Sequence, residues 1–261
     1  IAPLETAGCR PAPEAAVEEE APPDEGLLER LGWRYPYPAL AQIPSKLTAT
    51  GLKGRFLDQE AEEEAVPVQA ETAPRQSAIR RPVFAQEALG LTAAQRGTAV
   101  HLVMQHLDFA RTGSPAEIAA QVEELAARRL ITPQQGETVD CGNIARLFAS
   151  PLGRELRESG TVRREFKFSV LLPASDYYPQ APAGEEILLQ GVIDAWMETP
   201  EGIALVDFKT DRVSAAQAPA KAEEYRGQLD AYARALEELT GQPVRHRVLW
   251  FFFPGTAVAL P

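Results

Sequence analysis

Two apolar runs that each contain one aspartate constrain the fold of this 261-residue chain more than any other feature. Residues 187–196 (ILLQGVIDAW) and 203–210 (IALVDFKT) are rich in β-branched and aromatic side chains, which favours β-strands. The short, glycine-containing segment between them predicts an antiparallel hairpin. In a regular hairpin Asp194 lies beside Asp207, and Asp207 shares a face with Lys209 because side chains alternate along a strand.

The two aspartates predict a metal site. Burying an unpaired carboxylate is costly, and two neighbouring carboxylates repel each other unless a positive charge lies between them. An exposed ion pair would explain an Asp-x-Lys pattern more simply, but Lys209 alone cannot neutralise both Asp194 and Asp207. Mg²⁺ is commonly held by one or two carboxylates together with substrate phosphates. A lysine at the same site can stabilise negative charge on a phosphate under attack. The pattern therefore favours phosphodiester hydrolysis.

A helix upstream of the hairpin contributes a further candidate. Thr92 and Gln95 have the spacing of a capping box, which predicts that a helix begins there. His101 lies on the same side of this helix as Gly97, which would allow close approach to a strand or a ligand. A lone histidine on a helix is more often structural than a metal ligand. His106 is the weaker candidate, since it projects roughly 140° away from His101 around the helix.

Four short motifs in the right order carry a resemblance to a known family. The chain resembles the RecB-like branch of the PD-(D/E)xK nucleases and, within it, the nuclease domains of AddA-type bacterial helicase–nuclease subunits. The resemblance covers most of the chain from about Trp33 onward. The motifs are GTAVH at 97–101, QGVID at 190–194, VDFKT at 206–210 and YRGQLDAY at 225–232.

The resemblance implies an α/β fold with a PD-(D/E)xK (restriction-endonuclease-like) core, a mixed central sheet flanked by helices. It also implies the roles of the site residues. His101, Asp194, Asp207 and the backbone carbonyl of Phe208 would bind the metal. Lys209 would be the catalytic lysine, which orients or activates the attacking water and stabilises the transition state.

Three further residues match the family pattern at positions that would support the site. Gln228 and Tyr232 match its QxxxY signature and share one helix face, because they lie four residues apart. The resemblance implies that they position the site and the substrate strand. Glu165 matches an acidic residue that precedes the core strands. Two roles stay open for it: organising the site from outside the metal's ligands, or binding a second metal.

The resemblance also implies a cofactor, a substrate and partners. Mg²⁺ would be the cofactor, with Mn²⁺ able to substitute, and single-stranded DNA the substrate. That strand would be delivered by the helicase portion of the same polypeptide, working with an AddB-like subunit in double-strand break processing for recombinational repair in the bacterial cytoplasm. Many relatives bind an iron–sulfur cluster through four cysteines. This chain has only Cys9 and Cys141, so we expect no cluster.

Two alternatives come from other functional classes. The chain could be a catalytically silent docking module that keeps the nuclease fold within a helicase–nuclease complex, although it has lost no metal ligand and no lysine. It could also be a metal-dependent hydrolase that acts on something other than nucleic acid. The GxxxH and QxxxY motifs in this order disfavour the second alternative.

Composition divides the chain into parts. Residues 1–26 are rich in Pro, Ala and Glu and predict a linker or flexible arm; residues 27–84 are a transition segment with an acidic loop; residues 85–261 form the expected nuclease core. Residues 1–72 carry 14 acidic and 6 basic side chains, so most of the net charge of −11 lies there. The core is nearly neutral, and we expect modest DNA affinity from it alone.

The remaining expectations concern secondary structure and context. Helices are predicted at 85–108, 115–130, 142–158 and 220–240, and strands at 162–171, 187–198, 203–210 and 246–253. The last strand should run parallel to the Asp207 strand through a right-handed crossover. Neither a membrane span nor a signal peptide is predicted. Because the chain begins at Ile1 rather than Met, we expect it to be a fragment of a longer polypeptide.

Overall fold

The computed structural model describes residues 32, 38, 40–52 and 91–261. The aromatic residues expected to dock on the core (Trp33, Tyr35 and Tyr37), the acidic loop and the beginning of the helix predicted at 85–108 lie outside these residues. The chain divides into two units, residues 1–42 and 43–261. In the first unit the structure describes a short 3₁₀ helix, η1 (Leu40–Gln42). All other elements belong to the second unit.

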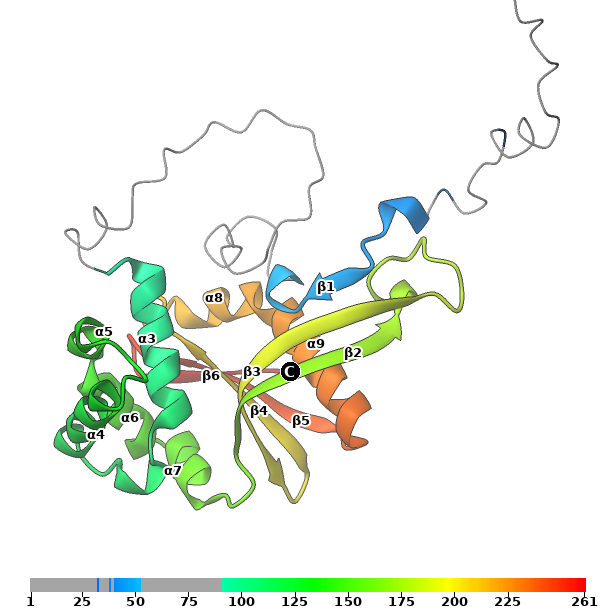
Figure 1. Cartoon of the computed structure of the whole chain (residues 1–261). Helices are drawn as coiled ribbons and strands as arrows, with labels where there is room; N and C mark the ends of the chain where they lie inside the picture. The colour runs from blue at the N-terminus through cyan, green and yellow to red at the C-terminus, as the bar shows by residue number, and fades with distance from the viewer. Residues whose placement is uncertain (1–31, 33–37, 39, 53–90) are drawn as a thin grey trace, which may run out of the picture. The chain divides into compact units, whose positions relative to one another are not determined.

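A mixed six-stranded sheet forms the centre of the second unit (Figure 1). Its strands are β1 (Lys46–Thr48), β2 (Arg163–Pro173), β3 (Glu186–Thr199), β4 (Gly202–Lys209), β5 (Val244–Phe251) and β6 (Thr256–Leu260). The order is β1-β3-β4-β5-β6, and β2 also pairs with β3. β3 and β4 form the predicted antiparallel hairpin, and β5 runs parallel to β4 as expected.

Helices cover both faces of this sheet (Figure 1). One hydrophobic cluster joins the sheet to α3 (Ala93–His106), α4 (Pro115–Ala127), α6 (Cys141–Ala149) and α7 (Pro151–Glu158). The short helix α5 (Pro133–Thr138) lies between α4 and α6 in the chain. A second cluster on the other face joins it to α8 (Ala218–Glu224) and α9 (Arg226–Thr240). Alternate residues of β4 enter the two clusters: Leu205 packs toward α9, and Val206 and Phe208 pack toward the α3–α7 layer.

Two predicted helices are each divided in the structure. The helix predicted at 142–158 is α6 followed by α7, because Ser150 ends the first and its hydroxyl accepts the N–H of Gly153 at 3.2 Å to begin the second. Pro151 occupies the first position of α7, where a missing N–H costs nothing. The helix predicted at 220–240 is α8 and α9, which meet at Tyr225. The short elements α5, β1 and β6 were not predicted.

The edge of β3 that faces β1 and β4 is shared between them. β1 pairs with residues 188–190 of β3, and β4 pairs with residues 195–199, while β2 runs along the opposite edge. Residues 191–194 therefore lie between the two ladders, in a fork of the sheet. The fork contains Asp194, the residue that the sequence singled out, and it lies between the two helical layers.

Candidate active site

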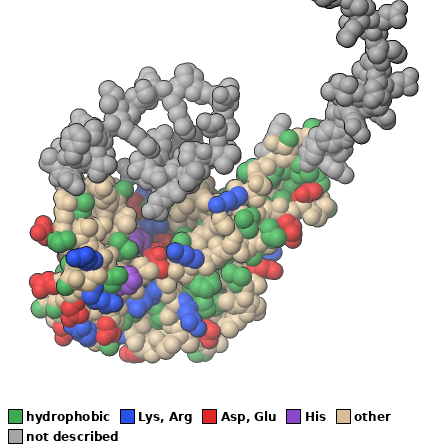
Figure 2. All heavy atoms as spheres, viewed as in Figure 1, with side chains coloured by type: hydrophobic (Ala, Val, Ile, Leu, Met, Phe, Trp, Pro, Cys, Tyr) green, Lys and Arg blue, Asp and Glu red, His purple; other side chains and the backbone are tan. Residues whose placement is uncertain are grey.

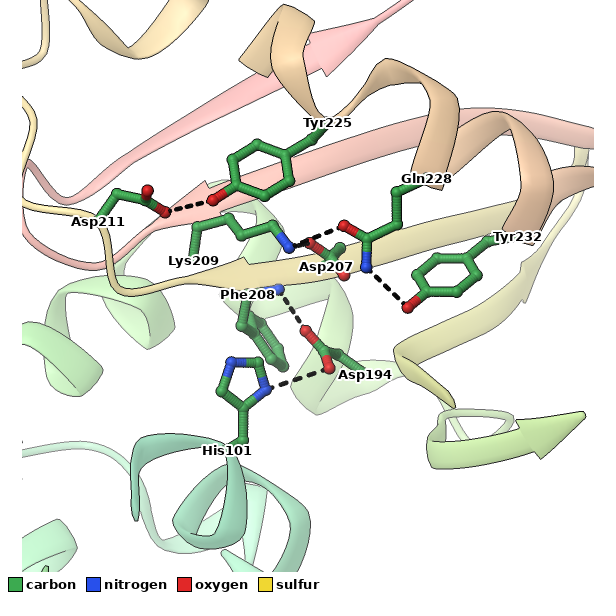
Figure 3. Close-up of polar contacts among 9 residues, drawn as sticks. All are labelled: His101, Asp194, Asp207, Phe208, Lys209, Asp211, Tyr225, Gln228 and Tyr232. Carbon is green, nitrogen blue, oxygen red and sulfur yellow. Dashed lines mark hydrogen bonds and ion pairs between the residues drawn. The ribbon is translucent and has the colours of Figure 1, made fainter. Parts of the chain in front are cut away.

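Asp194 replaces a missing ladder partner at the fork. Its Oδ2 accepts the backbone N–H of Phe208 at 2.7 Å, so a side chain takes the place of a neighbouring strand's carbonyl (Figure 3). Its Oδ1 lies 3.1 Å from Nδ1 of His101 on α3. These contacts bring together the GxxxH and QGVID motifs, which are 93 residues apart at these two positions. The carboxylate is thereby held in one orientation.

α3 is fixed at both ends, and this places His101. The predicted capping box is present: Thr92 and Gln95 exchange both hydrogen bonds. At the other end Arg164 donates to the carbonyls of Met104 and Leu107 at 3.0 and 2.5 Å. The sequence suggested no role for Arg164; its position directly before Glu165 was the only available signal.

Gly97 allows α3 to approach the end of β4. A Cβ added there would lie 3.1 Å from Oγ1 of Thr210, tighter than ordinary contact. The glycine of the GxxxH motif therefore lets the helix pack directly beside the residue that follows Lys209. This supports the expectation that Gly97 permits close approach to a strand.

Glu165 completes a cluster of potential metal ligands and has an unusual backbone. One ligand atom from each of His101, Glu165 and Asp194 lies within 4.8 Å of the other two. Glu165 has φ of +48°, in the left-handed region that costs a non-glycine residue about 1–2 kcal/mol. On β2 its neighbours Arg164 and Phe166 pair with Ala195 and Ile193, so Glu165 lies opposite Asp194. Such local strain is commonly found at functional sites.

Lys209 is held on the α9 side of β4. Its ammonium lies 2.7 Å from Oδ2 of Asp207, donates to Oε1 of Gln228 at 3.1 Å and lies 4.0 Å above the centre of the Tyr225 ring (Figure 3). Gln228 in turn donates its Nε2 hydrogen to the hydroxyl of Tyr232 at 2.8 Å. Thus the predicted pairs Asp207–Lys209 and Gln228–Tyr232 form one connected network.

Three residues without a predicted role extend this network. The Tyr225 hydroxyl donates to Oδ2 of Asp211 at 2.8 Å, and Asp211 lies two residues after Lys209 (Figure 3). Lys221 lies 3.9 Å from the other oxygen of Asp211. The sequence contained a signal for Tyr225, since it opens the YRGQLDAY motif. Nothing in the sequence signalled its contact with Lys209, which depends on how α8 and α9 meet.

Gly191 explains why the QGVID motif requires a glycine. A Cβ at this position would lie 2.8 Å from two ring atoms of Phe168 and 3.0 Å from Cε1 of Tyr232. The Phe168 and Tyr232 rings meet edge to face with their centroids 5.9 Å apart. A side chain at Gly191 would displace Tyr232, which holds Gln228. The motif therefore supports the lysine network as well as supplying Asp194.

The pKa values of the clustered groups reflect an excess of buried negative charge. Burial raises the pKa of Asp207 to about 6 and Asp194 adds to this effect, although Lys209 opposes it. Burial and the charge of Asp194 also raise the pKa of Glu165. For Asp194 burial acts in the same direction, but His101, Lys209 and the N–H of Phe208 together outweigh it and lower the pKa. Burial alone would lower the pKa of His101, yet Asp194 and Asp207 raise it to about 9.

This set of groups fits a divalent metal ion. His101, Glu165 and Asp194 offer one imidazole and two carboxylates, donors suited to Mg²⁺ or Mn²⁺ when carboxylates dominate. Asp207, predicted as a metal ligand, does not belong to this triplet; its Oδ2 lies 2.7 Å from the ammonium of Lys209. Phe208 is fixed through its N–H, and the use of its carbonyl as a ligand stays a prediction. In Figure 2, histidine, acidic and basic side chains gather in the furrow between α3 and β3.

Comparison with known proteins decides the family. The PD-(D/E)XK nuclease superfamily profile matches residues 69–259, which is most of the chain. The chain belongs to the PD-(D/E)XK nuclease superfamily. The sequence Asp207-Phe208-Lys209 fits the (D/E)XK part of that name.

Curated relatives of this PD-(D/E)XK chain are named as ATP-dependent helicase/nuclease subunits. The protein of Acetivibrio thermocellus is 39% identical over 251 residues, covering 92% of this chain and 19% of the relative. The protein of Desulforudis audaxviator is 40% identical over 236 residues, with 90% and 19% coverage. The chain thus spans about a fifth of the length of these relatives.

No helix among the described residues is long and apolar enough to cross a membrane.

Proposed function

We propose that this chain is the nuclease domain of a helicase–nuclease polypeptide and that it hydrolyses phosphodiester bonds of single-stranded DNA with a divalent metal ion, Mg²⁺ or Mn²⁺. The observation that carries the proposal is the position of Lys209. Lys209 lies on β4, and Asp194 lies on the neighbouring strand β3. The ammonium of Lys209 contacts Asp207 on β4 and Gln228 on α9. Lysine, carboxylates and imidazole meet at one fork of the sheet, a combination that suits metal-assisted phosphodiester hydrolysis.

The proposed mechanism assigns a task to each side chain. His101, Glu165 and Asp194 would hold the metal, joined by Asp207 and the Phe208 carbonyl. When bound, the ion would supply Lewis-acid polarisation of the phosphate and lower the pKa of a coordinated water. Lys209 orients the attacking water and stabilises negative charge on the phosphate.

The residues around the lysine act by positioning it. Gln228 accepts from the ammonium, and Tyr232 fixes Gln228 by accepting from its amide. The face of the Tyr225 ring provides a third contact, which favours the cation without removing a proton from it. The ammonium of Lys209 is therefore held by a residue of β4, by Gln228 on α9 and by Tyr225, which directly precedes α9.

The biological setting belongs to the same proposal. The relatives are helicase/nuclease subunits, and this chain covers a fifth of their length. We infer that the helicase portion of the same polypeptide feeds an unwound strand to this site during recombinational repair, together with an AddB-like subunit. Such delivery would compensate, through a high effective concentration, for a core whose sequence is nearly neutral in charge.

The first experiment is a cleavage assay with the 261-residue chain on labelled single-stranded and duplex DNA. It compares Mg²⁺, Mn²⁺ and EDTA, and includes Asp207→Ala and Lys209→Ala. Lys46→Ala on β1 is the matched control, since Lys46 is an exposed lysine of the same sheet. We expect metal-dependent cutting of the single strand that EDTA and the two site substitutions abolish and Lys46→Ala does not change.

A chain that does not cut is tested again within the full-length polypeptide and its complex. Cutting there that depends on Lys209 supports the proposal and shows that the motor is needed to load DNA. No cutting in the complex, with folding intact, refutes the nuclease proposal and favours the silent docking module.

A further inference from the structure

A cleft of about 890 Å³ opens beside His101. Its walls come from the first half of α3, the end of α5 with the start of α6, the segment that follows β4, and the turn between β5 and β6. Its lining includes Arg96, His101, Arg212, Tyr225, Phe252 and Phe253. His101 and Tyr225, which line the cleft, also contact Asp194 and Lys209, so the cleft borders the candidate active site.

Two arginines that line the cleft, Arg96 and Arg212, are exposed. Arg96 donates to the carbonyl of Leu91 at 3.1 Å, and neither arginine forms an ion pair with another residue that the structure describes. The cleft also contains two carboxylates: Asp211 accepts from Tyr225 and lies 3.9 Å from Lys221, and Asp140 caps α6 by accepting the N–H of Asn143. Guanidinium groups bind phosphates with several donors at once. The two arginines are therefore suited to contact phosphates on either side of the one being cut.

Phe253 is a large, exposed aromatic residue on the wall of this cleft. It is 52% exposed, whereas its neighbours Phe251 and Phe252 are buried. Single exposed hydrophobic residues are common on protein surfaces, so exposure alone decides nothing. What distinguishes Phe253 is that it lines the same cleft as His101 and the two arginines.

The turn that carries Phe253 is firmly attached. The N–H of Phe252 donates to the carbonyl of Lys209 at 2.9 Å, and the N–H of Gly255 donates to the carbonyl of Phe251 at 3.0 Å. Gly255 has φ of +64°, which glycine adopts without strain. Arg146 donates to the carbonyl of Phe253 at 3.3 Å. The ring is thus presented from a turn bonded to the backbone of the proposed catalytic lysine.

We propose that Phe253 is a stacking platform for a base of the bound single strand, next to the phosphate that is cut, while Arg96 and Arg212 bind the flanking phosphates. This inference rests on the proposed nuclease function and specifies its substrate contacts. A base can stack on a protein ring only when it is unpaired, so the platform selects single strands over duplex. Every base has a flat face, so it selects no sequence.

The test measures binding without cutting. The full chain with Lys209→Ala is titrated with fluorescent oligo-dT and with an abasic oligonucleotide of the same length, in Mg²⁺. Into this background we introduce Phe253→Ala, Phe253→Tyr and Leu239→Ala. Leu239 is the matched control because it is 48% exposed on α9 and does not line the cleft.

We expect Phe253→Ala to weaken oligo-dT binding by about 5- to 150-fold, the equivalent of roughly 1–3 kcal/mol for one stacked base. Binding of the abasic strand should not change, Phe253→Tyr should bind like the parent, and Leu239→Ala should match the parent on both ligands. An equal loss on both ligands, no loss on oligo-dT, or no binding of oligo-dT by the parent overturns the inference. Because cleavage is not measured, stacking can fail while the nuclease proposal stands, and the reverse also holds.

Discussion

The contact between Gln228 and Tyr232 can be tested quantitatively by removing each partner. Gln228 is 3% exposed and Tyr232 is 2% exposed, so neither group can turn to water when its partner is lost. Gln228→Leu removes the acceptor for Lys209 and the donor to Tyr232, whereas Tyr232→Phe removes only the hydroxyl. The two substitutions share one hydrogen bond, which a double-mutant cycle isolates.

The contacts set the expected magnitudes. A hydrogen bond to a charged group is worth about 1.5–3 kcal/mol and a neutral one about 0.5–1.5 kcal/mol, so Gln228→Leu should cost about 2–4 kcal/mol of unfolding free energy. Tyr232→Phe leaves a buried amide hydrogen without this partner and should cost about 1–3 kcal/mol. The double variant should cost about 1 kcal/mol less than the sum, since the shared bond can be lost only once.

Urea unfolding of the four proteins gives these free energies, and single-turnover cutting of a single strand gives the rate. We expect Gln228→Leu to lower the rate by about 10- to 100-fold, because a displacement near 1 Å at a catalytic group can have that effect. Strict additivity of the two costs would refute the shared contact. An unchanged rate in Gln228→Leu, with stability lost as expected, would refute the role of Gln228 in positioning Lys209.

Three further predictions concern other parts of the chain. Glu165→Gln should weaken metal binding by about 10- to 100-fold, so the rise in melting temperature on adding Mn²⁺ should become smaller. The metal-free chain should gain stability, because the substitution removes a carboxylate that repels Asp194. Calorimetry in Mn²⁺ and in EDTA measures both effects. Gly153→Ala should lower the free energy of unfolding by about 3 kcal/mol, because the added Cβ would lie 2.0 Å from the carbonyl oxygen of Leu147 in α6. Gly160→Ala is the control: a Cβ there would have no heavy atom within 4 Å, so the free energy of unfolding in urea should change by less than about 0.5 kcal/mol. Tyr225→Phe removes only the hydroxyl and should lower the free energy of unfolding by about 1 kcal/mol while the cutting rate is retained. Tyr225→Leu also removes the ring that contacts Lys209 and should lower the cutting rate. Equal cutting rates of the two variants would argue against the ring contact.

The parts of the site that follow local rules could be predicted from the sequence. Period-two alternation and a short turn placed Asp194 beside Asp207 and put Lys209 on one face of its strand. A capping box fixed the beginning of α3, and helical periodicity separated His101 from His106. These predictions depend on neighbouring residues and on elementary backbone geometry, which a sequence contains.

What could not be predicted depends on partners far away in the chain. β1 has three residues and exists because β3 offers it an edge, so its own sequence carries little signal. The left-handed backbone of Glu165 and the contact of Lys209 with Tyr225 likewise arise from packing. The division at Ser150 is different, because Ser-Pro is a helix-start signal that was present in the sequence.

The hydrogen bond from Phe208 to Asp194 has a consequence for how this domain can change over evolutionary time. A descendant that no longer needs to cut DNA can replace Asp207 and Lys209 together with little damage to the sheet, because apolar side chains can take the place of a buried ion pair and the lysine side chain supports no backbone group. Losing the acceptor at position 194 instead leaves a part-buried N–H of the central hairpin unpaired, at a cost of about 1–3 kcal/mol. In lineages that have become inactive, position 194 should therefore retain aspartate or asparagine long after position 209 has drifted.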